Sequence, residues 1–320
     1  MQPGSPPESP KASLKVKLLL VFIPLLLCFG AAEFVLRWNI INDDERNILY
    51  RFDSELGWFP KEKLVTKYGG DYPMSVSQNS LGFRDREFLP KQKNRVAFVG
   101  DSFAWGFDSE VENRFDRILE KTMPNQEFVN LGVSGFGTDQ ELLLLRRFLV
   151  KVEPDLVYLF FHPNDRYTNT RNRVYNGYYK PIYKKSSQGN IEVHGVPVPM
   201  GLQYLKYKHP FFFRSNVVKY VSTRMLNVFS PEEVHPDLTT ELLLEMRSFL
   251  ESKNVALKIG IVGSYSDENI IGTLREARFD FKVIDTTGRD VDPHLFTNTG
   301  HWSIEGNQRA AKTIQLHLQE

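Results

Sequence analysis

Short apolar runs alternate with longer amphipathic stretches from Val96 onward, and this alternation limits the fold more than any other feature of the sequence. The apolar runs predict buried strands at residues 96–100, 127–131, 156–161, 256–262 and 281–284. Helical periodicity is found between them, at residues 114–121, 140–150, 240–252, 268–276 and 305–318. Strands that alternate with helices form parallel sheets covered on both faces. We therefore expect residues 94–320 to fold as a three-layer α/β/α sandwich with a central parallel sheet.

The composition is that of a globular protein without a strong charge bias. Hydrophobic residues make up 41% of the 320 residues, which is enough for a large core. The 40 basic and 39 acidic residues leave a net charge of +1, so no overall field attracts nucleic acid, and we predict no nucleic-acid partner. Because Cys28 is the single cysteine, no disulfide can form within these residues.

The N-terminal residues predict a membrane segment. Residues 1–17 contain three lysines, and the next fifteen residues carry no charge. With Lys17 and Arg37 at the two interfaces, residues 18–37 are just long enough to cross a bilayer as a signal anchor. The lysines place residues 1–17 in the cytoplasm and the rest of the chain outside it, in the periplasm or at the cell surface. The alternative is a cleaved signal peptide, because Gly30-Ala31-Ala32 provides the small residues of a cleavage site; both interpretations export the rest of the chain.

Two further regions fall outside the regular alternation. Residues 38–93 contain several turn signals, and we expect a stalk and a flanking segment that packs on the domain. Residues 166–235 form a Tyr-rich insertion after the third predicted strand. One interpretation is a substrate-binding insertion in which Tyr167 and Arg171 contact sugar rings; the other is an excursion with a small core of its own around Phe211, Phe212 and Phe213.

Polar residues that suit acyl-transfer chemistry follow successive predicted strands. Ser102 comes after the first strand, in Gly100-Asp101-Ser102, and a serine nucleophile needs a base and oxyanion donors. Gly135 in a glycine-rich loop offers a backbone N–H, Asn164 offers a side-chain amide, and His301 before the last helix is a candidate base. Each of these residues alone is also typical of a turn, a cap or a surface position. Their order after successive strands favours a common site, because ligands bind beyond the carboxyl ends of parallel strands.

The same four blocks resemble the SGNH, or GDSL-like, hydrolase superfamily over about residues 79–318. The resemblance implies an SGNH hydrolase-like, flavodoxin-like sheet with Ser102 as nucleophile and His301 as base. It assigns the oxyanion donors to the Ser102 backbone N–H, to Gly135 at the end of the second block, and to Asn164 in the third. His162 departs from the glycine common before that block, which would narrow the pocket and make His162 a candidate substrate contact. From the residues themselves, we expect Asp101 and Asp165 to bind local backbone N–H groups.

One departure from the family concerns the acid of the triad. The family usually has an aspartate three residues before the histidine, where this chain has Asn298. An aspartate there would fix the histidine tautomer and stabilise the imidazolium. Three alternatives follow: another acid substitutes, with Asp292 and Asp285 the nearest in sequence; a Ser-His dyad operates with backbone help; or activity is lost.

The resemblance implies a serine esterase that forms an acyl-enzyme on Ser102. The lead-in at 79–84 and the N-terminal segment are similar to a membrane-anchored bacterial branch that handles acyl groups on surface polysaccharides, which makes acylated polysaccharide the expected ester substrate. The alternatives are an O-acyltransferase that works with a membrane acyl-transfer partner, or a glycan-binding module disarmed at Asn298. We expect no cofactor, and no metal, because His294 and His301 lack the acidic or cysteine pattern of a metal site.

Overall fold

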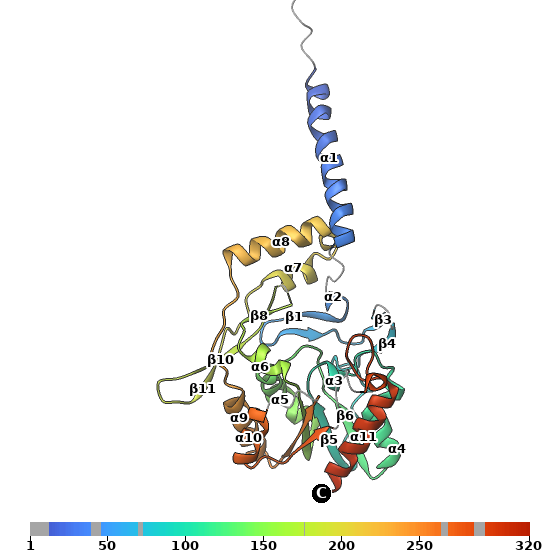
Figure 1. The fold of residues 1–320 in the computed structure, drawn as a ribbon, viewed down its shortest axis with the longest axis vertical. Helices are drawn as coiled ribbons and strands as arrows, with labels where there is room; N and C mark the ends of the chain where they lie inside the picture. The colour runs from blue at the N-terminus through green and yellow to red at the C-terminus, as the bar shows by residue number, and fades with distance from the viewer. Residues whose placement is uncertain (1–12, 40–45, 70–72, 176, 264–267, 285–291) are drawn as a thin grey trace, which may run out of the picture.

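A five-stranded parallel sheet forms the centre of the part of the chain that the structure describes (Figure 1). The structure is a computed structural model, and it describes residues 13–39, 46–69, 73–175, 177–263, 268–284 and 292–320. The strands lie in the order β13-β12-β7-β5-β6, and every neighbouring pair is parallel. Their bounds confirm the five predicted strands: β5 (Asn94–Val99), β6 (Gln126–Asn130), β7 (Leu156–Phe161), β12 (Ala256–Val262) and β13 (Phe281–Ile284).

This strand order places a topological switch point of the sheet beside Ser102. The chain moves from β5 to β6 on one side and then to β7 on the other, so the connections leave β5 and β7 in opposite directions. Such a switch point opens a crevice at the carboxyl ends of the two strands, which is where open α/β sheets bind ligands. The short helix α3 (Ser102–Trp105) begins directly after β5, and α6 (Asn164–Asn169) begins directly after β7.

Helices cover both faces of the sheet, which confirms the predicted three layers (Figure 1). On one face α4 contacts α11, and on the other α5 contacts α9. All the predicted helices are present within about two residues: α4 (Phe115–Thr122), α5 (Thr138–Val152), α9 (Thr239–Glu251), α10 (Glu268–Glu276) and α11 (Ile304–Gln319).

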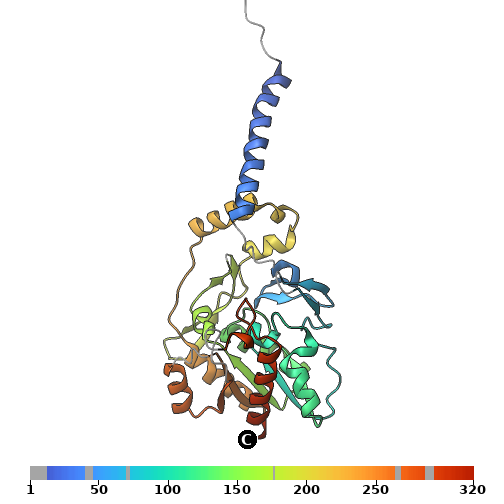
Figure 2. The ribbon, with the colours of Figure 1, turned by 45° about the vertical axis from the view of Figure 1, so that its right-hand side comes forward.

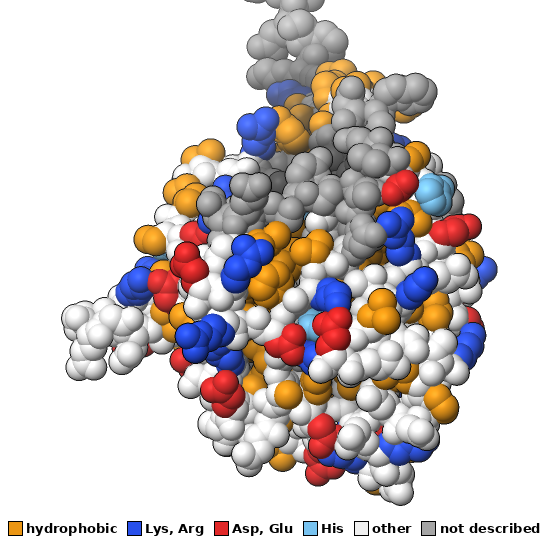
Figure 3. Space-filling model, turned by 60° about the horizontal axis from the view of Figure 1, so that its bottom comes forward, with side chains coloured by type: hydrophobic (Ala, Val, Ile, Leu, Met, Phe, Trp, Pro, Cys, Tyr) orange, Lys and Arg blue, Asp and Glu red, His pale blue; other side chains and the backbone are white. Residues whose placement is uncertain are grey.

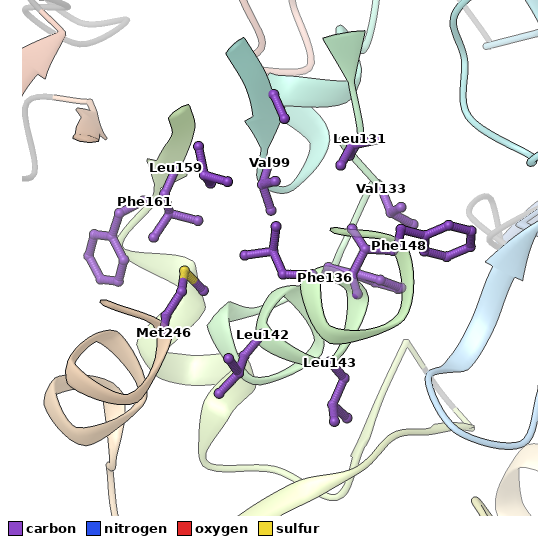
Figure 4. Close-up of a cluster of buried hydrophobic side chains, with 14 of the residues drawn as sticks. Val99, Leu131, Val133, Phe136, Leu142, Leu143, Phe148, Leu159, Phe161 and Met246 are labelled. Atoms are coloured by element: carbon purple, nitrogen blue, oxygen red, sulfur yellow. The ribbon is translucent and has the colours of Figure 1, made fainter. Parts of the chain in front are cut away.

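Alternating side chains of each strand divide the core into two clusters. In β5, Phe98 packs toward Phe115 of α4, with ring centroids 4.9 Å apart. Val99 belongs to the other cluster, which Figure 4 shows between the sheet and α5. Because successive strand residues point to opposite faces, a strand buried on both faces reads as a continuous apolar run. This is why the apolar runs located the strands correctly.

The residues before the sheet share its core. They form α2 (Arg46–Leu49) and two antiparallel hairpins, β1 (Tyr50–Asp53) with β2 (Gly57–Pro60) and β3 (Val65–Tyr68) with β4 (Met74–Ser77). Trp58 is fully buried and makes edge contacts with Phe136 and Tyr178. Arg147 of α5 forms ion pairs with Asp53 and Glu55. From residue 46 on, this segment therefore packs on the sheet domain, whereas residues 40–45 of the predicted stalk lie outside the described residues.

The insertion at 166–235 forms two small hairpins and a helical layer. Its buried tyrosines, Tyr178 and Tyr183, join the main core. The alternative prediction of a separate core around Phe211, Phe212 and Phe213 is wrong for Phe211 and Phe212, because their side chains are 72% and 62% exposed and so do not form a core. The elements are β8 (Arg173–Val174), β9 (Tyr178–Tyr179), β10 (Ile182–Lys185), β11 (Ile191–His194), α7 (Leu202–Lys208), the 3₁₀ turn η2 (Phe212–Arg214) and α8 (Asn216–Phe229).

Helix α1 (Leu14–Asn39) projects away from the sheet domain, and its lower end meets α8 (Figures 1 and 2). Its residues Leu14–Arg37 contain an 18-residue window with a mean hydropathy of 2.5 and are long enough to cross a membrane. A membrane anchor and a signal sequence share this length and composition. The helix includes the whole of the predicted span at 18–37.

Candidate active site

Ser102 lies at the sharp turn between β5 and α3. The turn depends on Gly100, whose φ of +156° is in the region that favours glycine, and whose Cβ would come within 2.8 Å of Phe160. The side chain of Asp101 caps α3 by accepting a hydrogen bond from the Phe103 N–H at 2.9 Å. This confirms the local role predicted for Asp101. The turn places Ser102 at the start of α3, beyond the carboxyl end of β5.

His301 is in direct contact with this hydroxyl. Its Nε2 lies 2.8 Å from the Ser102 Oγ. The structure therefore brings together the predicted nucleophile and base, which come from the loops after the first and last strands. A neutral imidazole whose Nε2 has no proton can accept the serine proton.

Thr299 and Asp108 occupy the other side of the imidazole. The Thr299 hydroxyl lies 2.8 Å from His301 Nδ1 and donates in turn to the Asp108 carboxylate. Asp108 Oδ2 is 3.8 Å from His301 Nδ1 and also accepts from the Thr297 hydroxyl at 2.7 Å. Since a hydroxyl has one proton and Thr299 gives it to Asp108, Nδ1 of His301 must carry the proton in that bond. This leaves Nε2 as the acceptor that faces Ser102.

Aromatic rings and burial set the pKa of His301. Phe107 stacks on the imidazole with ring centroids 4.6 Å apart, and Phe103 lies 5.2 Å away on a tilted plane. Burial lowers the pKa of His301 from its ordinary value, Asp101 and Asp108 oppose this, and His162 and Arg46 add to it. The net effect is a pKa of His301 below its ordinary value. A lowered pKa keeps the imidazole neutral at pH 7, as a base requires.

The loop with Gly135 packs against the nucleophile turn. Asn130 accepts from the Gly132 N–H at 2.9 Å and donates to the Ala104 carbonyl at 2.7 Å, which holds the loop on α3. Gly135 has a φ of +82°. Among the described residues, the N–H groups of Ser102 and Gly135 donate to no acceptor. The turn at Ser102 and the loop with Gly135 thus each hold a backbone donor that is unpaired within the described part of the chain, the kind of group that stabilises an oxyanion.

Asn164 is the third predicted donor and begins α6. Its Nδ2 donates to Asp101 Oδ2 at 3.3 Å, so its amide lies beside the nucleophile turn. Asp165 is fully buried and accepts from the His162 N–H at 3.0 Å, as predicted for its local role. The His162 ring stacks on Phe103 at 5.0 Å. His162 therefore lines the same side of the crevice as Asn164.

Buried carboxylates lie beneath the nucleophile turn. Asp101, Glu141 and Asp165 are each fully buried. Burial raises the pKa of Glu141 well above its ordinary value, and the neighbouring charges of Asp101 and Asp139 raise it further. Both carboxylate oxygens of Glu141 have no hydrogen-bond partner among the described residues. Burial therefore favours the protonated form of the Glu141 carboxyl, because an isolated buried charge is costly.

The acid candidates named from sequence lie elsewhere. Asn298 is exposed, and Thr299 is the side chain that contacts His301 Nδ1. Asp292 lies 3.7 Å from Arg309 in an ion pair at the start of the 3₁₀ turn η3 (Pro293–Leu295). Asp285 is outside the described residues. Of the described acids, Asp108 is the one that reaches His301 through Thr299.

The predicted substrate contacts lie along α6. Tyr167 is 55% exposed and is three residues after Asn164, so the two share one face of the helix. The Arg171 guanidinium lies 3.5 Å from the centroid of the Tyr167 ring and forms an ion pair with Glu232. Arg171 therefore supports the tyrosine ring from one side.

Sequence reasoning missed four residues around the site. Asp108 and Thr299 are described above; Arg46 and Tyr175 lie against Gly135, whose Cβ would come within 2.8 Å of Arg46 and 2.6 Å of the Tyr175 hydroxyl. Arg46 donates to the Ser134 carbonyl at 3.0 Å and lies over the Tyr175 ring. Thr299 stood within a motif already considered and Tyr175 stood within the Tyr-rich insertion, but no local pattern pointed to Asp108 or Arg46.

Comparison with known proteins gives similar structures only. No family model and no curated protein matches the sequence. The chain is similar to a member of the lipolytic protein G-D-S-L family from Veillonella parvula, with 14% identity, 70% of this chain and 97% of that chain covered, and a TM-score of 0.41. It is also similar to the psychrotrophic esterase EstA from Pseudoalteromonas, with 10% identity, 71% of this chain and 97% of that chain covered, and a TM-score of 0.45. A third similar structure is that of Axe2, an acetylxylan esterase from Geobacillus stearothermophilus, with 13% identity, 70% of this chain and 94% of that chain covered, and a TM-score of 0.39.

The first of these structures is named as a G-D-S-L family protein, the family that the four sequence blocks resemble, and the other two are named as esterases. Their identity to this chain is low, and the candidate site is defined by the geometry of this chain's own residues.

Proposed function

We propose that this chain is a serine esterase in which Ser102 is the nucleophile and His301 is the base. The observation that carries the proposal is the continuous hydrogen-bonded series from Ser102 through His301 and Thr299 to Asp108. It supplies a nucleophile, a base in the correct tautomer and a buried carboxylate, which are the parts that serine acyl transfer needs.

In the proposed mechanism, Ser102 Oγ attacks the ester carbonyl carbon while its proton passes to His301 Nε2. The Ser102 and Gly135 N–H groups and the Asn164 amide stabilise the oxyanion. The imidazolium then protonates the leaving alcohol, and the acyl group remains on Ser102. Water attacks this acyl-enzyme with His301 again as base, which releases the acid. Asp108 stabilises the imidazolium through Thr299 in both halves of the reaction.

The proposed substrate is an O-acylated carbohydrate at the cell surface. Tyr167 presents an exposed aromatic ring next to Asn164, and aromatic faces suit the apolar faces of sugar rings. Helix α1 would hold the domain at the outer face of a membrane, which agrees with the lysines that precede the apolar residues.

Two other functions are less well supported. A binding module has no use for a base bonded to its serine at 2.8 Å, so this contact argues against it. An acyltransferase would use the same acyl-enzyme and differ only in the acceptor. We propose hydrolysis because water needs no acceptor site.

The test is hydrolysis of p-nitrophenyl acetate by the full chain in detergent, compared with the Ser102→Ala and His301→Ala variants. We expect each variant to lose activity by a factor on the order of 10³ or more. Asp292→Asn is the matched control, because it alters an acid near the histidine block that does not contact the imidazole. Equal background rates in the wild type and both variants would refute the esterase proposal.

A further inference from the structure

Helix α1 is tied to the helical layer of the insertion at its lower end. The Glu33 carboxylate accepts hydrogen bonds from the N–H groups of Asn216 at 2.7 Å and Val217 at 3.0 Å, and from the Ser215 hydroxyl at 2.9 Å. Glu33 thereby satisfies the free N–H groups at the start of α8. In both views α8 lies across the foot of α1 (Figures 1 and 2). If α1 crosses a membrane, α8 lies at its surface.

The composition of residues 202–230, which we name the interfacial segment, differs from that of the rest of the chain. It contains five basic residues and no acidic residue: Lys206, Lys208, Arg214, Lys219 and Arg224. Basic and acidic side chains are interspersed on the face that Figure 3 shows. A basic helical segment that is also rich in aromatic residues is typical of binding to an anionic membrane surface.

The apolar side chains of α8 divide into a packed side and an exposed side. Leu226 lies against Gly177 together with Leu202 of α7, so α7 covers this side. Tyr220, Val221, Arg224, Met225 and Val228 are exposed and recur at the spacing of one helix face. Val228 and Phe229 are 72% and 79% exposed. An apolar stripe of this kind marks a surface that binds another apolar phase.

The interfacial segment is packed against the rest of the domain through α7. Leu202 and Gln203 of α7 are buried, and Gln203 donates to the Tyr179 carbonyl at 3.2 Å. Tyr204 makes an edge contact with Phe52 of β1, with ring centroids 5.3 Å apart. Through these contacts the position of the segment is coupled to the sheet domain. In Figure 1, α3 and α6 of the candidate site lie on the side of the sheet nearer this layer.

We propose that the interfacial segment lies in the surface of an anionic lipid bilayer, with Phe211, Phe212, Val228 and Phe229 at the boundary between head groups and acyl chains. This proposal rests on the membrane anchor proposed above but not on esterase activity. If the proposal holds, α1 and the interfacial segment form two contacts with one membrane, and these contacts fix the orientation of the sheet domain. The candidate site then faces the bilayer.

The test measures the depth of single fluorescent labels in the full chain. Cys28→Ser removes the single cysteine, and NBD is then attached at Phe212→Cys or Val228→Cys in nanodiscs that contain phosphatidylglycerol. Leu26→Cys in α1 reports insertion of the anchor. Val150→Cys is the matched control, because Val150 is 82% exposed near the end of α5, at the opposite edge of the sheet.

We expect lipids with a doxyl group near the head group to quench the labels at residues 212 and 228 by at least about twofold, and to leave residue 150 unchanged. Lipids with a doxyl group deep in the acyl chain should quench the label at Leu26, at the middle of the proposed span. Quenching at 228 should weaken when phosphatidylcholine replaces phosphatidylglycerol, and also in Arg224→Glu. Arg275→Glu, an exposed arginine of α10, should leave it unchanged.

Each other outcome has a defined meaning. Quenching at Leu26 with none at 212 or 228 would overturn the proposal and leave the anchor intact. The labels at residues 212 and 228 could instead be shielded from water without being quenched by lipid, in a particle of twice the expected protein mass. This result would mean that a second copy of the chain covers the exposed side of α8, and it would also overturn the proposal. Quenching at 212 and 228 without quenching at Leu26 would support the surface contact and refute the spanning helix.

Discussion

Replacement of Asp108 by asparagine tests the part of the site that the sequence did not reveal. The variant removes a negative charge 3.8 Å from His301 Nδ1 while it keeps a side chain that accepts hydrogen bonds from Thr297 and Thr299. Asp108 has a φ of +61°, a conformation in which asparagine is also common, so we expect the fold to be preserved. The change therefore isolates the charge.

The distance sets the size of the effect. Two unit charges 3.8 Å apart interact by about 4 kcal/mol at an effective dielectric constant of about 20. This value is an upper bound on the imidazolium stabilisation that is lost, and it corresponds to about three powers of ten in rate. Because Thr299 still holds the tautomer, we expect kcat/KM to fall by a factor on the order of 100 to 1,000.

The pH profile of kcat/KM provides a second measurement. Burial lowers the pKa of His301, and Asp108 opposes this. Removal of its charge should lower that pKa further, so the acid limb of the profile should move to lower pH while its plateau falls. Asp292→Asn should change neither. A wild-type rate and an unchanged acid limb in Asp108→Asn would refute the role of Asp108.

Three further predictions follow from single contacts. Thr299→Val removes the acceptor of the His301 Nδ1 proton and should lower kcat with little change in KM, whereas Thr299→Ser should restore most of it. Burial raises the pKa of Asp53, but hydrogen bonds from Arg147 and the backbone lower it to about 2. Since the pKa of Asp53 is depressed in the folded state, the Asp53 carboxylate stabilises the fold by about 2 kcal/mol above pH 4, and this stabilisation is lost as the pH falls toward 2. Chemical unfolding should therefore show that Asp53→Asn is less stable than the wild type at pH 7 but not at pH 2. Burial raises the pKa of Glu141, so the contribution of Glu141 to stability should decline as the pH rises above 4.5, and thermal unfolding of Glu141→Gln should show a smaller loss of stability over this pH range than the wild type.

The central fold could be predicted from the sequence because its signals are local. Strands buried on both faces are continuous apolar runs, and each of the five runs became a strand of the parallel sheet. The carboxyl ends of parallel strands meet at one edge, so Ser102 and His301 could be placed in one site before their contact was known. The ordered blocks of the SGNH resemblance carried the same information.

The rest depended on contacts that have no local pattern. Asp108 reaches His301 only because Gly106 and Asp108 both take positive φ values after α3, which turns the carboxylate back toward the last loop. Its link to the imidazole is the hydroxyl of Thr299 rather than a direct bond. Arg46 reaches Gly135 from a helix far away in sequence. No spacing rule predicts these contacts, because tertiary packing alone brings the segments together.

Covalent trapping of the nucleophile tests the central claim most directly. The full chain would be treated with a fluorophosphonate, and the modified residue and its rate of modification would be measured by mass spectrometry of the intact protein and its peptides. We expect a single phosphonyl group on Ser102, with a rate of modification that falls sharply in His301→Ala and less in Asp108→Asn. A protein that remains unmodified, or one modified at another residue, would contradict the assignment of Ser102 as the nucleophile.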